Sequence, residues 1–183
     1  KKLHKESTVV DLHCHSAIKA SMFHRDLGSK KQKWLSTLFN RKFWPFANRA
    51  SFPRLMEGQM DVILSTAYVP EAGWYDDISL VRWIMKLAPS VRKQQSYFDA
   101  AMSMMDDIEG HITKWNASDK NERKIDLCSS VADLDAALES GSLAMIHSLE
   151  GAHSLQNNSA EKIPHEIPPT HERKLVDAIT NLE

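Results

Sequence analysis

The chain has 183 residues, of which 42% are hydrophobic and 26% are charged, and its formal net charge is -1. These values are typical of a globular protein and exclude a disordered or fibrous chain. The near-neutral balance gives no electrostatic reason to expect a nucleic acid or an anionic membrane as a partner. No apolar run reaches the ~18 residues of a membrane span, and no signal-peptide pattern is present. Because the chain begins at Lys1, the compartment stays open between the cytoplasm and, after removal of a leader, the periplasm or extracellular space.

The first predicted strand covers Thr8–Leu12 and leads into two histidines, within the segment V-V-D-L-H-C-H-S. Residues i and i+2 of a strand point to the same side, so His13 and His15 are expected to leave the strand end in one direction. Two neutral imidazoles that converge can bind a divalent transition metal. The sequence therefore predicts His13 and His15 as metal ligands. The alternative is a pair of strand-end histidines satisfied by hydrogen bonds.

The middle of the chain is less regular. Residues 17–53 are predicted to form a long inserted loop, with or without a short helix. Met60–Pro70 is predicted to be the second strand, closed by its proline. Apolar residues at helical spacing run from Leu80 to about Trp115, and Pro89 is expected to divide this stretch into two helices.

The last third alternates between strand and helix patterns. Its predicted elements, in chain order, are an extended piece over Lys124–Cys128, a helix over Val131–Glu139, a strand over Leu143–Leu149, a loop over 157–170 and a helix from about His171. Ser130 is predicted to cap the helix over Val131–Glu139, and Gly141 is predicted to end it. Such alternation predicts an α/β fold with a parallel sheet and right-handed crossovers.

The strand over Leu143–Leu149 also ends in a potential ligand, Glu150. Parallel α/β barrels build metal sites from ligands at the C-terminal ends of their strands. Gly151 lets the backbone turn sharply there, and His153 is placed to reach back toward whatever Glu150 holds. A carboxylate can bridge two metal ions, which together acidify a hydroxide and polarise a carbonyl during amide hydrolysis. The alternative is a carboxylate that faces water.

The length sets an upper limit on the fold. A complete (β/α)₈ barrel takes ~250 residues, more than this chain has. We therefore expect residues 1–183 to be the N-terminal portion of a single TIM-barrel domain, with about three βα units and the inserted loop at about 17–53. Cys14 and Cys128 are expected to be buried and unpaired.

Three segments together resemble the membrane (renal) dipeptidase family, peptidase family M19 of the amidohydrolase superfamily. They are V-V-D-L-H-C-H-S, E-G-Q-M-D-V-I-L-S-T-A-Y-V and S-L-A-M-I-H-S-L-E-G-A-H-S-L. The third segment is the most specific, because the family's third strand ends in E-G-x-H-S. The resemblance implies a binuclear zinc hydrolase that cleaves dipeptides and carries two Zn²⁺ ions in a TIM barrel.

The resemblance also assigns roles to individual residues. It implies that His13 binds the first metal and that Glu150 bridges both. It implies that His153 is a substrate-side catalytic histidine, which polarises the scissile carbonyl or steadies the tetrahedral intermediate. The family's further histidine ligands and its late aspartate are expected after residue 183.

His15 departs from the family pattern, which is usually H-x-D at this strand, whereas H-x-H is common in the wider superfamily. The alternative functions are therefore another hydrolase of the superfamily, acting on cyclic amides, lactones or phosphoesters, or a catalytically inactive barrel used as a binding scaffold. The expected partner is a small-molecule dipeptide. The oligomeric state, a homodimer included, stays open.

Overall fold

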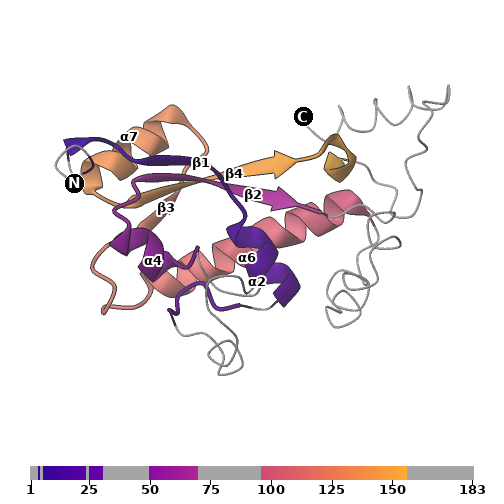
Figure 1. Cartoon of the computed structure of the whole chain (residues 1–183), viewed down its shortest axis with the longest axis horizontal. Coiled ribbons are helices and arrows are strands. Elements are labelled where there is room, and N and C mark those ends of the chain that lie inside the picture. Colours follow the sequence, from indigo (N-terminus) through magenta and orange to yellow (C-terminus); the bar gives the residue numbers. More distant parts are fainter. Residues whose placement is uncertain (1–3, 5, 24, 31–49, 70–95, 156–183) are drawn as a thin grey trace.

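The computed structural model describes residues 4, 6–23, 25–30, 50–69 and 96–155, which form a four-stranded sheet with helices on both faces (Figure 1). The strands are β1 (Val10–Cys14), β2 (Val62–Tyr68), β3 (Ile125–Leu127) and β4 (Leu143–Glu150). Their spatial order is β1-β2-β4-β3, and each pairing is parallel. The predicted parallel α/β sheet is confirmed.

β2 lies within the predicted Met60–Pro70 and is two residues shorter at each end, whereas β1 is displaced along the chain. This strand begins and ends two residues later than the predicted Thr8–Leu12, so His13 lies inside it. The predicted extended piece at Lys124–Cys128 contains β3, whose three residues pair with the start of β4. β4 is one residue longer than predicted and includes Glu150.

Among the described residues, three helices cover one face of the sheet: α2 (Ser16–Phe23), α4 (Phe52–Glu57) and α6 (Tyr97–Asn116) (Figure 1). The apolar stripe of α6 repeats every three or four residues and faces the strands, as the amphipathic pattern predicts. Phe52, Ile63 and Ile108 are fully buried in this core. Each such side chain stabilises the fold by roughly 2 kcal/mol.

Helix α7 (Val131–Ser140) lies on the opposite face, where Ala137 packs with Val62 and Ala144 (Figure 1). The reason is topological. β3 lies outside β4, so the chain crosses the sheet in the reverse direction between them, and a right-handed crossover then places its helix on the other face. The predicted cap at Ser130 and the predicted stop at Gly141 are both confirmed, the latter with φ +74°.

Several predictions lie wholly or partly outside the described residues. Helix α2 occupies the start of the predicted loop over 17–53, and residues 31–49 are not described. The second helix of the predicted pair is α6, whereas the first falls within 70–95. The predicted loop over 157–170 and the helix after it also lie outside.

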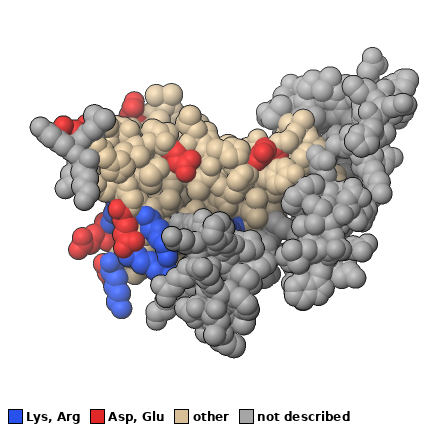
Figure 2. Space-filling model, in the orientation of Figure 1, with Lys and Arg blue, Asp and Glu red and all other residues tan. Residues whose placement is uncertain are grey.

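Cys14 and Cys128 are free and buried, as predicted. Burial raises the pKa of both thiols. None of the helices in the described ranges is long and apolar enough to cross a membrane. On the described part of the face in Figure 2, Lys and Arg side chains gather at one end beside acidic ones, so charges of both signs are neighbours there.

Candidate metal centre

A bulge at the end of β1 sets the direction of the two histidines. Asp11 pairs with Ile63 but Cys14 pairs with Ser65, so β1 has one residue more than β2 over this stretch. The Asp11 carboxylate accepts a hydrogen bond from the His13 backbone N–H at 3.0 Å and holds the bulge. Bulges of this kind re-aim side chains beside functional sites.

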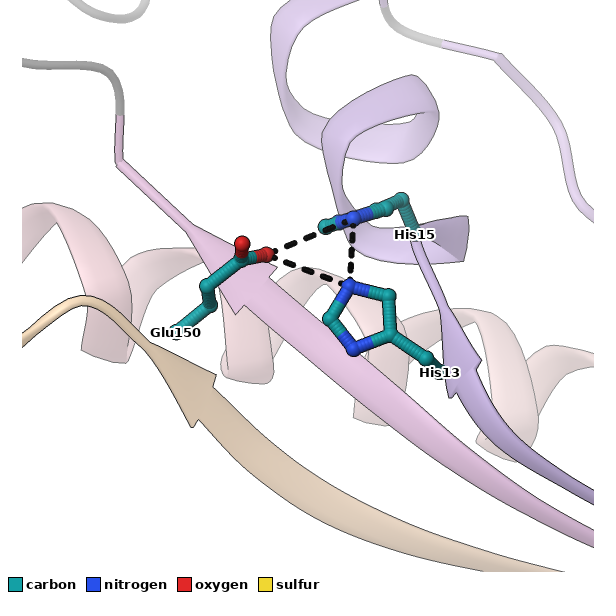
Figure 3. A group of neighbouring side chains, drawn as sticks. All are labelled: His13, His15 and Glu150. Atoms are coloured by element: carbon teal, nitrogen blue, oxygen red, sulfur yellow. Dashed lines mark hydrogen bonds and ion pairs between the residues drawn. The ribbon is translucent and has the colours of Figure 1, made fainter.

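His13, His15 and Glu150 converge at the C-terminal edge of the sheet (Figure 3). The Nε2 atoms of the two histidines are 2.9 Å apart. Glu150 Oε2 lies 3.3 Å from His13 Nε2 and 3.4 Å from His15 Nε2. β2 separates β1 from β4, so the glutamate reaches across the end of β2, where Tyr68 is its partner in the sheet. The structure thus brings together the three residues that the sequence predicts as ligands.

The donor geometry of this group fits a divalent metal. Four-coordinate zinc with bonds of about 2.0–2.1 Å separates neighbouring donor atoms by about 3.3 Å. The two histidine–glutamate distances are close to this value, whereas the two histidine nitrogens lie closer together, at the 2.9 Å of a hydrogen bond. Glu150 Oε2 is buried and, among the described residues, accepts no hydrogen bond. Its near neighbours are the two imidazole nitrogens at 3.3 and 3.4 Å, and a cation bound among the three atoms would compensate for the missing hydrogen bond. The residues present therefore fit the metal that the sequence predicts.

The three side chains are also accessible. Their exposed fractions are 56% for His13, 37% for His15 and 41% for Glu150. Catalytic zinc sites differ from structural ones by keeping a coordination position open to water or substrate. A group whose donor atoms converge while its side chains stay half-exposed is suited to a catalytic site.

His153 lies apart from this group. It belongs to the short helix η3 (Ala152–Leu155) and is 5% exposed. Its Nε2 is 2.7 Å from the carbonyl oxygen of Val69, and its ring makes edge contacts with Tyr68 and Tyr97. That His153 touches the substrate stays a prediction, since the contacts in the structure are with the protein itself.

Gly151 makes the sharp turn that the sequence predicts, with φ +85°. A Cβ atom at this position would lie 2.3 Å from Cε1 of His153, which is far inside van der Waals contact. Glycine is therefore required here both for the backbone conformation and for the approach of the imidazole ring.

Sequence reasoning gave no role to Tyr68. Its ring lies 6.4 Å from that of His15 and 5.9 Å from that of His153, so it contacts both histidines. Its position at the end of the second predicted strand was the signal that could have identified it. His147 lies on the opposite face from Glu150, as predicted, and its Nε2 is 3.2 Å from a carboxylate oxygen of Glu109 on α6.

A parallel α/β sheet with a histidine–glutamate group at its C-terminal edge is the arrangement of a TIM-barrel metal hydrolase. Comparison with known families agrees: the model for membrane dipeptidase (peptidase family M19) matches residues 1–163. The chain belongs to the membrane dipeptidase family, whose members are metal-dependent hydrolases with a TIM-barrel fold. The comparison with curated proteins found no match. The four parallel strands are consistent with part of such a barrel.

Proposed function

We propose that the protein is a zinc-dependent dipeptidase that hydrolyses the peptide bond of dipeptides with a metal-activated water. The observation that carries the proposal is the convergence of His13, His15 and Glu150 donor atoms at the C-terminal sheet edge. Family membership supports the reaction class and the dipeptide substrate. The described residues are proposed to be part of one barrel domain, with the loop at about 17–53 inserted after β1.

The two imidazoles and the carboxylate would hold the ion through His13 Nε2, His15 Nε2 and Glu150 Oε2. When bound, zinc would supply a Lewis acid for the scissile carbonyl and a readily deprotonated water. The histidines act as neutral donors, so Glu150 contributes the charge of the group. The second oxygen of Glu150 points away from both rings (Figure 3), and this carboxylate is proposed to offer it to a second zinc ion.

His15 favours a second candidate function. A histidine here, in place of the family's usual aspartate, leaves the described ligand group with one carboxylate instead of two. The H-x-H pair is common in the wider amidohydrolase superfamily, so the second candidate is a hydrolase of cyclic amides, lactones or phosphoesters that uses the same metal chemistry. Dipeptides remain our first proposal because the Glu150-to-Ser154 segment follows the dipeptidase pattern.

The test is the zinc content of the purified full-length protein, measured by elemental mass spectrometry, followed by a screen of dipeptides. We expect about two zinc ions per chain, as in a two-metal hydrolase, and release of free amino acids. Hydrolysis of a lactone, a cyclic amide or a phosphoester without dipeptide cleavage would favour the second candidate. Absence of metal even after zinc is supplied would contradict both and leave a binding scaffold.

A further inference from the structure

We propose that His153 is a positioning residue, which holds the turn after β4 and thereby directs Glu150 toward His13 and His15. This inference rests on the proposed metal site but concerns a residue outside the ligand group. The ring is buried, and it contacts Val69 and Tyr68 at the end of β2 and Tyr97 of α6.

The hydrogen bond from His153 to Val69 joins the exits of β2 and β4. A carbonyl oxygen only accepts hydrogen bonds, so Nε2 of His153 carries the proton and donates the hydrogen bond to the Val69 oxygen, 2.7 Å away. Val69 directly follows Tyr68, the residue that pairs with Glu150 in the sheet. The bond therefore fixes the turn after Glu150 to the strand that Glu150 crosses.

The backbone around Glu150 is arranged to receive this ring. Gly151 has φ +85°, and its missing Cβ provides the space that the imidazole occupies. Ser154 closes the turn, because its N–H donates to the Gly151 carbonyl at 2.9 Å and its hydroxyl donates to the Glu150 carbonyl at 3.1 Å. Displacing the ring would release the turn that fixes the Glu150 backbone.

Tyr68 connects His153 to the two histidines of the ligand group. Its ring makes edge contacts with His153 on one side and with His15 on the other. Tyr97 of α6 packs against His153 with ring centroids 5.3 Å apart and holds it in place. Side chains that orient metal ligands commonly change metal affinity by about 10–100-fold when replaced.

The experiment measures the zinc dissociation constant by competition with a chelator, together with kcat and KM, for two substitutions. His153→Gln keeps an N–H that can reach Val69, whereas His153→Leu has similar bulk and no donor. We expect His153→Leu to weaken zinc binding by about 10–100-fold and His153→Gln to recover most of that loss. His147→Gln is the matched control, since this histidine lies on the other face of β4, and its zinc affinity should equal that of the wild type.

The results separate this inference from the proposed function. If both His153 variants bind zinc as the wild type does but lose about 10²-fold in kcat, His153 acts on the substrate and the positioning role is wrong. If the wild type binds zinc, His13→Ala abolishes binding and His153→Leu has wild-type affinity and rate, only this inference fails. If the wild type binds no zinc, the proposed function fails and the inference fails with it.

A second pair of variants keeps the inference testable if His153→Leu does not fold. Gly151→Ala places a Cβ atom against the imidazole and should weaken zinc binding. In a His153→Ala background the imidazole atoms that crowd this Cβ are absent and the strain of the positive φ remains, so the double variant should lose less affinity than the product of the two single losses. Independent effects of the two substitutions would overturn the proposed coupling.

Discussion

The helix α7 and the C-terminal edge of the sheet satisfy their polar groups in opposite ways. At the start of α7, Ser130 and Asp133 form a reciprocal capping box, and Gly141 ends the helix in the left-handed conformation. At the sheet edge, Glu150 Oε2 is buried without a hydrogen bond among the described residues, beside two half-exposed histidines. The cap is complete by itself, whereas we propose that a bound cation completes the edge.

The α7 cap contributes to the stability of the fold, whereas the sheet edge carries the group proposed to function as a metal site. Local rules of capping and turn chemistry are obeyed around α7, where no ligand is required. The edge combines a bulge in β1 with a buried carboxylate oxygen that accepts no hydrogen bond among the described residues. Departures of this kind concentrate at functional sites, because the surrounding structure supports them.

Metal removal is expected to have the largest effect on the edge and none on the cap. Zinc that binds only the folded protein stabilises it by about 4 kcal/mol at a thousand times the dissociation constant. Treatment with a chelator should therefore abolish activity and lower the midpoint of thermal unfolding, and added zinc should restore both. A melting temperature unaffected by zinc would show that the edge is complete without a metal.

Glu150→Gln should produce the next largest effect. The substitution keeps the shape of the side chain but removes the charge that binds the ion, and loss of a ligand of this kind costs at least ~10² in rate. The metal-free variant should be as stable as the metal-free wild type, because the substitution removes a buried carboxylate oxygen that accepts no hydrogen bond among the described residues. Calorimetry with and without zinc, together with initial rates, checks both expectations. Retained turnover would contradict the assignment of Glu150.

His15→Asp tests the departure from the family pattern. The change restores H-x-D and adds a carboxylate next to Glu150, which favours harder ions such as Mn²⁺ over zinc. We expect the ratio of manganese to zinc affinity to rise by about tenfold, measured by chelator competition for each ion. An unchanged ratio would show that His15 does not contact the metal.

The sequence predicted the parts that depend on short-range patterns. The apolar runs of β2 and β4 and the cap at Ser130 need only neighbouring residues. Their confirmation explains why two strand ends that lie 135 residues apart, at His15 and Glu150, could be assigned to one site. Parallel strands bring their C-terminal ends to the same edge.

The features it did not predict depend on contacts between distant segments. The bulge in β1 comes from pairing with β2, and the strand itself begins and ends two residues later than predicted. The face that α7 covers depends on β3 pairing outside β4. The burial of His153 depends on contacts with Tyr97 of α6 and with Val69, which directly follows β2. Both residues are far from His153 in the sequence, so the sequence pattern around His153 could not predict its burial.

The smallest effects are expected at the α7 cap, where they should leave the metal site untouched. Ser130→Ala removes the hydroxyl that accepts from the Asp133 N–H and should cost about 1 kcal/mol in the free energy of unfolding, measured in urea.

The Asp133 carboxylate makes the cap sensitive to pH. Hydrogen bonds from the Ser129 backbone N–H and from the side chains of Ser130 and Ser129 hold the pKa of Asp133 below its ordinary value of 3.8. Because the pKa of Asp133 is lower in the folded state than in the unfolded state, its ionised carboxylate stabilises the fold at neutral pH. This stabilisation is lost as the pH falls through the folded-state pKa. The stability advantage of the wild type over Asp133→Asn should therefore shrink in acid, while the zinc affinity at pH 7 is the same in both. A difference in zinc affinity would show that the cap and the sheet edge are coupled.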